Sequence, residues 1–169
     1  YNPVNEKLTI AKEDRTFKGY VRKNGDVGVR NEIWIVPTVG CVNGIAERLA
    51  NTLKQETGLQ GIDGIHAWHH NYGCSQLSED HESTRKILRD IVLHPNAGGV
   101  LVLSLGCENN QPDAFMEILG DYDKDRIKLV VTQKVDGDET EYCMNVLRDI
   151  YNLAKEESKI GRASCRERV

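Results

Sequence analysis

Three Gly-Cys pairs recur along this 169-residue chain at one fixed interval. Their cysteines are Cys41, Cys74 and Cys107, so successive thiols are 33 residues apart. A thiolate binds iron or zinc well, and three protein ligands with one open position are typical of a catalytic metal site. A single cysteine is more often a small core residue. Three at matching positions favour a shared site.

The spacing of the three pairs indicates how the chain would position them. Each pair follows an apolar run, at 33–37, 64–68 and 99–105, and each precedes a helical pattern. An interval of this length matches one strand–helix unit of a parallel sheet. Parallel strands end at the same edge, where open α/β sheets bind their ligands. We therefore expect the three thiols at one carboxyl edge.

The remaining patterns complete an α/β fold. An Asn-Gly turn signal within residues 17–30 predicts a β-hairpin. Apolar periodicity predicts a fourth strand at 127–132 and helices after residue 41, over 78–93, from 112 and over 138–157. The predicted fold is a three-layer, doubly wound, mainly parallel sheet of about four strands with helices on both faces, preceded by the short hairpin. We expect two helices to bury apolar stripes, one of Ile87, Leu88, Ile91 and Val92, the other of Tyr142, Cys143, Val146, Leu147, Ile150 and Leu153.

Composition excludes several classes of partner. Hydrophobic residues make up 39% and charged residues 28%, as in ordinary globular domains. A net charge of −4 gives no electrostatic basis for binding nucleic acid or an anionic membrane. No apolar run approaches the ~20 residues that span a bilayer, and the start does not resemble a signal peptide. We therefore expect a cytoplasmic protein with reduced cysteines.

Both ends of the chain differ in character from the middle. Residues 1–16 are polar and predict a linker or arm that follows a further amino-terminal domain. Residues 160–169 lack an apolar period and match the translation of a common sequencing-adapter oligonucleotide. We therefore expect a non-native tail, whose Cys165 is left out of the thiol count. The predicted native domain is 17–159.

Polar side chains accompany the cysteines at the predicted edge. His70, before the second Gly-Cys pair, suits a metal ligand or a general base near neutral pH, and its neighbour His69 would point to the other face. Thr38, Asn43 and Asn109 lie beside the first and third pairs. Such groups, with helix amino-terminal amides, suit a hydroxylated, anionic small molecule. Helix capping by the two asparagines is the alternative.

Two residues ahead of the first strand suggest an anion contact. Arg30 could bind a carboxylate through two parallel hydrogen bonds, with Asn31 beside it. A surface arginine without a ligand is the alternative. Neither a Gly-x-Gly-x-x-Gly nor a Gly-x-x-x-x-Gly-Lys-Ser/Thr motif occurs, so a nucleotide-binding fingerprint is absent.

The same residues carry a family resemblance. Several long motifs, in order, closely resemble the middle, second domain of the altronate/galactarate dehydratase family, and the likeness runs from about residue 17 to residue 158. They are Asn-Gly-Asp-Val-Gly-Val-Arg-Asn at 24–31, Pro-Thr-Val-Gly-Cys-Val-Asn-Gly at 37–44, His-Asn-Tyr-Gly-Cys-Ser-Gln at 70–76, His-Pro-Asn-Ala-Gly at 94–98 and Leu-Gly-Cys-Glu-Asn-Asn-Gln at 105–111.

The resemblance implies a function that the motifs alone do not. It implies part of a hydro-lyase that dehydrates D-altronate to 2-dehydro-3-deoxy-D-gluconate in hexuronate breakdown, with ferrous iron as cofactor and further domains before and after this region. The implied reaction removes the proton α to the carboxylate and the β-hydroxyl. A Lewis-acidic iron can stabilise the charge that develops.

Site roles follow from the resemblance together with position. Cys41, Cys74 and Cys107 become candidate iron ligands and His70 a candidate base or ligand. The candidate contacts to the sugar acid are Arg30, Asn31, Thr38, Asn43 and Asn109. His69 ranks below His70 because relatives carry another residue there. Two alternatives stay open: a galactarate dehydratase or sulfo-lyase relative, and a non-catalytic α/β module with merely buried cysteines.

Overall fold

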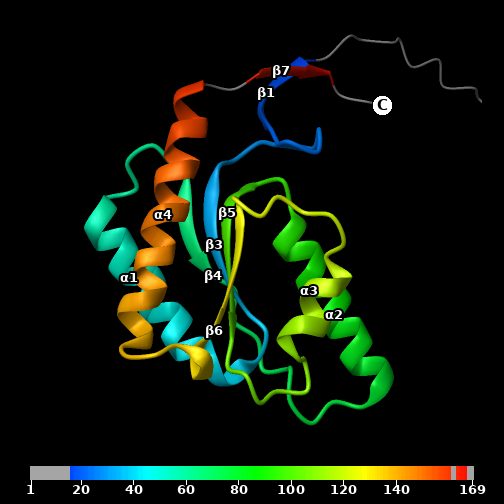
Figure 1. The fold of residues 1–169 in the computed structure, drawn as a ribbon. Coiled ribbons are helices and arrows are strands. Elements are labelled where there is room, and N and C mark those ends of the chain that lie inside the picture. The colour runs from blue at the N-terminus through cyan, green and yellow to red at the C-terminus, as the bar shows by residue number, and fades with distance from the viewer. Residues whose placement is uncertain (1–15, 161–162, 167–169) are drawn as a thin grey trace, which may run out of the picture.

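A four-stranded parallel sheet forms the centre of the protein (Figure 1). In the computed structural model, residues 16–160 and 163–166 are described. The sheet has the order β4-β3-β5-β6, with every neighbouring pair parallel. Its strands are β3 (Glu32–Pro37), β4 (Gly64–Ala67), β5 (Ala97–Ser104) and β6 (Ile127–Val131). The predicted parallel sheet of about four strands is confirmed.

The strand order creates a switch point between β3 and β5. The chain leaves β3 to form β4 on one side, and then returns to form β5 and β6 on the other. Loops that leave β3 and β5 at their carboxyl ends therefore diverge, and ligands of open α/β sheets bind in that crevice. The backbone amide of Thr38 donates to the Leu103 carbonyl across it (2.9 Å). This crevice is the edge that the Gly-Cys pairs share.

Four helices cover the two faces of the sheet. They are α1 (Asn43–Thr57), α2 (Ser78–Leu93), α3 (Pro112–Ile118) and α4 (Glu139–Ile160), with 3-10 turns η1 (Gly40–Val42) and η2 (Thr132–Lys134). Figure 1 shows α1 and α4 on one face and α2 and α3 on the other. The predicted doubly wound, three-layer arrangement is therefore confirmed. None of the helices in the described residues has the length and apolar content needed to cross a bilayer.

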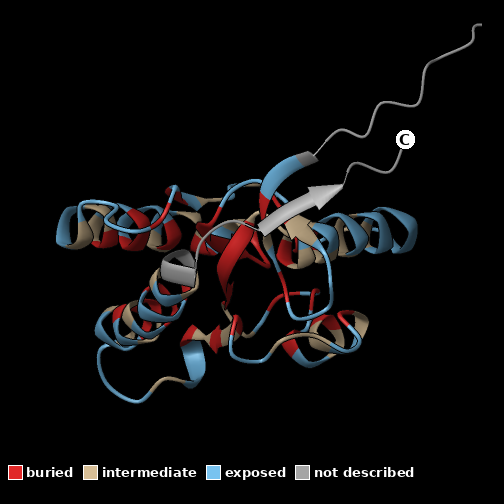
Figure 2. Cartoon of the chain, turned by 90° about the horizontal axis from the view of Figure 1, so that it is seen from above, coloured by how far each residue is buried: buried red, intermediate tan, exposed pale blue. Residues whose placement is uncertain are grey.

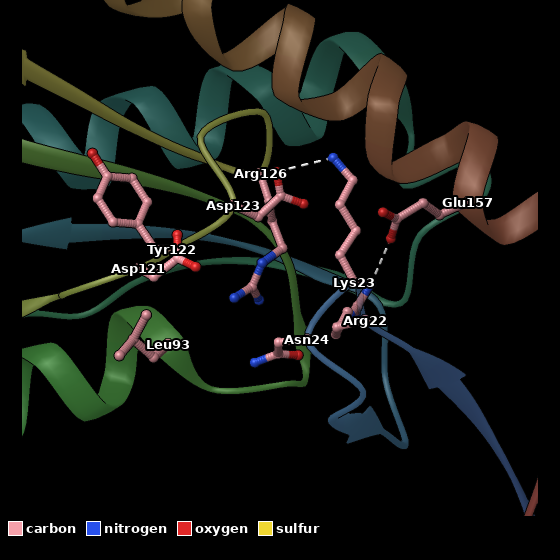
Figure 3. Close-up of a pocket in the computed structure, with 9 residues that line it drawn as sticks. All are labelled: Arg22, Lys23, Asn24, Leu93, Asp121, Tyr122, Asp123, Arg126 and Glu157. Atoms are coloured by element: carbon pink, nitrogen blue, oxygen red, sulfur yellow. Dashed lines mark hydrogen bonds and ion pairs between the residues drawn. The ribbon is translucent and has the colours of Figure 1, made fainter.

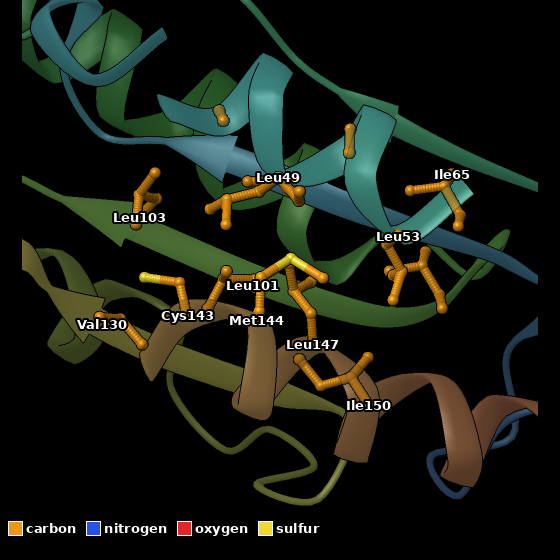
Figure 4. Close-up of a cluster of buried hydrophobic side chains, with 14 of the residues drawn as sticks. Leu49, Leu53, Ile65, Leu101, Leu103, Val130, Cys143, Met144, Leu147 and Ile150 are labelled. Atoms are coloured by element: carbon orange, nitrogen blue, oxygen red, sulfur yellow. The ribbon is translucent and has the colours of Figure 1, made fainter. Parts of the chain in front are cut away.

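Alternation along the strands supplies both halves of the core. Ile33 and Ile35 of β3 face α1 and α4, whereas Trp34 and Val36 face α2 and α3. All β5 side chains are buried, as expected for a strand covered on both faces. Figure 2 shows this buried centre between helices whose outer faces are exposed. The α1–α4 half is drawn in Figure 4, with Leu49, Leu53, Ile65, Leu101, Leu103, Val130, Cys143, Met144, Leu147 and Ile150 labelled.

Three side chains expected in buried stripes are exposed instead. In α2, Leu88 and Val92 face the sheet and are buried, whereas Ile87 is 62% exposed. In α4, Tyr142 and Leu153 are about half exposed. Each lies at the border of its stripe, beyond the part that the sheet and neighbouring helices cover. The predicted stripes were therefore wider than the surfaces that bury them.

A hairpin precedes the parallel sheet, as predicted. Strand β1 (Thr16–Val21) pairs antiparallel with β2 (Val27–Gly28), and Gly25 has the positive φ of 88° that the turn requires. Arg22 anchors the hairpin: its guanidinium donates to Glu157 (2.6 Å), to Asn31 (3.0 Å) and to the Pro95 carbonyl (2.8 Å).

The predictions for the two ends of the chain remain predictions. Residues 1–15 of the expected arm lie outside the described residues, and Thr16 begins β1. Helix α4 continues to Ile160, and a short strand β7 (Ala163–Arg166) pairs antiparallel with β1. This pairing shows where residues 163–166 lie, and it does not address whether the tail is native.

Candidate functional site

The three Gly-Cys cysteines lie at the carboxyl edge of the sheet, as expected. Cys41 is in η1 after β3, Cys74 follows β4, and Cys107 follows β5. All three are exposed, so they are not core residues. The backbone amide of Asn109 donates to the Cys74 sulfur, and the Gln133 side chain donates to the Cys107 sulfur (3.6 Å). The structure therefore brings three accessible thiols to the switch point.

The thiols influence one another electrostatically. Partial burial raises the pKa of Cys74, and the nearby thiols of Cys41 and Cys107 raise it further. Burial is the largest cause, and the contributions of Cys41, Cys107 and Glu108 to the raised pKa show that these groups lie near Cys74, because like charges disfavour each other's ionised form. A cation placed among them would reverse the effect.

Glycine precedes these cysteines for a steric reason. Gly73 has φ +103° and Gly106 has φ +120°, values that side chains rarely adopt. A Cβ at residue 73 would also press on the Thr38 carbonyl oxygen and lie 2.7 Å from the Val39 Cα. The loop that carries Cys74 therefore packs directly on the backbone that leaves β3. This close approach brings Cys74 towards the other two thiols.

Glu108, which the sequence reasoning did not select, organises the crevice. Its side chain is 1% exposed and accepts hydrogen bonds from the Thr38 hydroxyl (2.7 Å), the Ser104 hydroxyl and the Gly106 amide (2.5 Å). Burial alone would raise its pKa, but these bonds and one from its own amide lower it. An ionised carboxylate therefore sits directly behind the thiols. Its position after a Gly-Cys pair was the signal available in the sequence.

Thr38 and the predicted asparagines are at this edge, with different surroundings. Thr38 is buried against Glu108, and Asn109 is exposed. Asn43 donates to the His70 carbonyl (2.7 Å). Neither α1 nor α3 has a side-chain hydrogen bond at its N-cap, so neither Asn43 nor Asn109 caps either helix. Asn110, which was not predicted, donates to the Thr38 carbonyl (3.2 Å). The side-chain oxygens of Asn43 and Asn110 are buried without a hydrogen-bond partner among the described residues.

His70 is held by backbone groups on both sides of its ring. Nδ1 accepts a hydrogen bond from the Tyr72 amide (3.1 Å), so Nε2 carries the proton and donates to the Pro37 carbonyl (2.8 Å). In this arrangement the imidazole has no free lone pair, which a base or a ligand needs. His69 points elsewhere, with its Nε2 2.8 Å from a Glu47 carboxylate oxygen. His70 therefore orients its loop, and proton transfer would require it to leave Tyr72.

Arg30 and Asn31 are not part of this edge. They precede β3 and lie at its amino-terminal end, with the length of the strand between them and the cysteines. Asn31 is buried and fully engaged, since it binds the Ala154 carbonyl (2.7 Å) and Arg22. Arg30 is exposed and pairs with Glu32 (3.0 Å). The structure thus separates the expected carboxylate clamp from the thiols, because strand direction places it at the opposite edge.

A cavity at the amino-terminal edge of the sheet is lined by charged side chains of both signs. It has a volume of about 240 Å³ and is lined by Arg22, Lys23, Arg126, Asp123 and Glu157, among others (Figure 3). Arg22 pairs with Glu157 and Lys23 with Asp123 (3.1 Å), while the buried Arg126 donates to backbone carbonyls. Its positive and negative side chains balance, so this cavity offers no net attraction for an anionic substrate.

The fit of the thiol edge to a metal ion is partial. Three sulfurs are chemically suitable ligands for iron. As the side chains stand, however, no three His, Cys, Asp or Glu residues in the described part of the chain could hold one ion. Cys74 and Cys107 both lie in loops rather than in strands or helices. Ligation by all three would therefore require these loops to draw together.

Thiol reactivity tests this placement of the cysteines. In a Cys165→Ser background at pH 7.5, we expect iodoacetamide to modify Cys41 and Cys107 first and Cys74 more slowly, because the raised pKa lowers its thiolate fraction. Cys143 should react only after unfolding, since burial raises its pKa to about 11. Peptide mass spectrometry measures the four rates. Modification of native Cys143 as fast as Cys41 would contradict the structure.

Comparison with known proteins places the chain in a family. Residues 19–155 match the model of the "D-galactarate dehydratase/Altronate hydrolase, second domain" family. Altronate dehydratase of Escherichia coli is 49% identical over 160 residues, which cover 94% of this chain and 32% of that protein. Altronate dehydratase of Bacillus subtilis is 50% identical over 156 residues, 92% of this chain and 31% of that protein.

A more distant relative is named for a different activity. The (2R)-sulfolactate sulfo-lyase subunit beta of Chromohalobacter salexigens is 34% identical over 91 residues, which cover 54% of this chain and 21% of that protein. The chain spans about a third of the length of the altronate dehydratases that it matches. The family match covers the hairpin from β1 onward, the whole parallel sheet and most of α4. The chain therefore belongs to the D-galactarate dehydratase/altronate hydrolase family and corresponds to its second domain.

Proposed function

We propose that this domain supplies the thiol edge of a sugar-acid hydro-lyase whose substrate is D-altronate. The single observation that supports this most is the convergence of three accessible cysteines on the switch point of a domain about half identical to two altronate dehydratases. Loss of water from altronate would give 2-dehydro-3-deoxy-D-gluconate, a step of hexuronate breakdown. We place the protein in the cytoplasm, where its thiols would stay reduced.

We propose ferrous iron as the cofactor, with Cys41, Cys74 and Cys107 as its ligands. The donor chemistry and the carboxylate of Glu108 behind the thiols, which accepts its hydrogen bonds from neutral groups, favour a cation there. When bound, iron would supply Lewis acidity for the carboxylate and hydroxyl oxygens of the substrate. The side-chain oxygens of Asn43 and Asn110, which are buried without a hydrogen-bond partner among the described residues, are the acceptors that substrate hydroxyls could use at this edge.

His70 is the proposed base for the proton α to the carboxylate. It lies at the same edge, where Asn43 donates to the His70 carbonyl and the Gly40 amide donates to the Tyr72 carbonyl. To accept a proton, Nδ1 must first release the Tyr72 amide. Thr38 would act through Glu108 rather than on the substrate, because its hydroxyl is buried against that carboxylate.

The activity of a full-length chimera tests this proposal. In the chimera, this chain replaces the matched 160 residues of Escherichia coli altronate dehydratase. We expect the anaerobic, iron-loaded chimera to consume D-altronate, and the 169-residue chain alone to be inactive because two thirds of the relatives' length is absent. Product is measured as the 2-keto acid. Turnover by the isolated chain, or consumption of (2R)-sulfolactate or galactarate in preference to altronate, would overturn the assignment.

The non-catalytic module is the second candidate. One observation favours it, the lack of a ready three-ligand group among the described side chains. In that case the domain would support a neighbouring catalytic domain. The chimera distinguishes the two, because a mere support would tolerate replacement of all three cysteines by serine without loss of turnover.

A further inference from the structure

A groove runs between β4 and α2. Two adjoining cavities of about 540 Å³ and 160 Å³ form it, since both are lined by Trp68, Ile87 and Ile91. Arg30 and Asn96 lie at one end, and the other end reaches His70 and Tyr72 of the site loop. The groove therefore connects the amino-terminal edge of the sheet with the candidate site.

Large apolar side chains line the groove and its margin without cover. Trp34 forms the buried floor, and Trp68 packs edge-to-face on it with ring centroids 4.9 Å apart. Trp68 is 39% exposed, Ile87 62%, and Tyr72 58%. Monomeric proteins rarely leave such apolar residues together on one surface unless something binds there.

The neighbouring backbone is also open. Strand β4 pairs with β3 on one side, and no described strand pairs with its other side. Exposed edge strands invite pairing and are usually covered or blunted. Ile87 continues the apolar stripe of α2 beyond the part that the sheet buries. The periodicity of α2 thus places an apolar residue where no described part of the chain covers it.

We infer that this groove is the docking surface for a neighbouring domain of the same polypeptide. About two thirds of the relatives' length lies outside the matched region, so ample chain exists to cover it. The family match identifies this domain as the second of its proteins, which makes a packed neighbour expected. The Tyr72 carbonyl accepts a hydrogen bond from the Gly40 amide (2.9 Å). This bond joins the end of the groove to the edge that carries the thiols. The docked domain therefore lies against the candidate site.

Side-chain footprinting tests the inference independently of the proposed chemistry. Carbene labelling is compared, residue by residue, between the isolated chain and the full-length chimera, whose folding is established by cooperative thermal unfolding. We expect labelling of Trp68 and Ile87 to fall about tenfold in the chimera, as apolar contacts at a domain interface exclude the reagent. Unchanged labelling of both residues would overturn the inference. The inference would also be overturned if labelling of these residues fell in the isolated chain as its concentration rose, because a second copy of the chain would then occupy the groove.

Substitution of Ile87 provides a second, matched measurement. Ile87→Lys should leave the unfolding temperature of the isolated chain unchanged, because the side chain is already exposed there. In the chimera the same change buries a charge and should lower the unfolding temperature by several degrees, whereas Ile87→Leu should not. An equal effect of Ile87→Lys in both contexts would contradict docking at this groove.

Discussion

Replacing Gly73 by alanine should unfold the site loop from the sheet at a cost of about 3 kcal/mol in the free energy of unfolding. Two causes add. Residue 73 has φ +103°, and a Cβ would meet the backbone of Thr38 and Val39. That backbone leaves the central strand β3 and cannot move aside without breaking the Thr38–Leu103 hydrogen bond. Urea denaturation followed by circular dichroism measures the loss.

The matched control is Gly44→Ala. Gly44 lies in the first turn of α1, only three residues beyond Cys41, and a Cβ there meets nothing within 4 Å. Stability should be unchanged or rise by up to about 1 kcal/mol, because alanine is the better helix former. If Gly73→Ala stayed within about 0.5 kcal/mol of the wild type, the close packing of the Cys74 loop on β3 would be wrong.

Glu108→Ala should produce the second large effect, again a loss of about 3 kcal/mol. The substitution removes the acceptor of three hydrogen bonds and leaves the Gly106 amide without a partner in a buried crevice. It also empties the volume of a side chain that is 1% exposed. The ends of β3 and β5 would then lose the carboxylate that joins Thr38 to Ser104. The same urea titration measures the change.

Glu117→Ala is the control for this effect. Glu117 is an exposed residue of α3, so its replacement should change stability by no more than about 0.5 kcal/mol. Equal stabilities of the two variants would mean that Glu108 does not join the strand ends. The account of the crevice as a structure organised around a buried carboxylate would then fail.

The elements of the fold could be predicted because the hydrophobic patterns are local. Strand β5 is an almost continuous apolar run, and the predicted helix 78–93 coincides with α2. The strand order could not be predicted, because pairing of β3 with β5 depends on contacts between segments far apart in the chain. The width of the buried stripes also depends on tertiary packing, which is why Ile87 is exposed.

The site was predictable where it followed from strand direction. The three thiols are at one edge because each follows a parallel strand, and Arg30 and Asn31 are at the other because they precede one. The position of Glu108 after a Gly-Cys pair places it at this edge, but its burial could not be predicted, since that depends on a loop that folds back over Thr38 and Ser104. The backbone bonds of His70 likewise depend on the approach of the 70–73 loop to Pro37.

The iron content of the chimera tests the central claim most directly, namely that the thiol edge is the metal-binding centre. The anaerobically purified chimera is analysed by inductively coupled plasma mass spectrometry beside a Cys41→Ser/Cys74→Ser/Cys107→Ser variant and a Cys143→Ala variant. Cys143 is buried in the α1–α4 half of the core, away from the edge, so its replacement should leave iron in place. The account predicts that the triple variant loses its iron. Full iron content in the triple variant would contradict it.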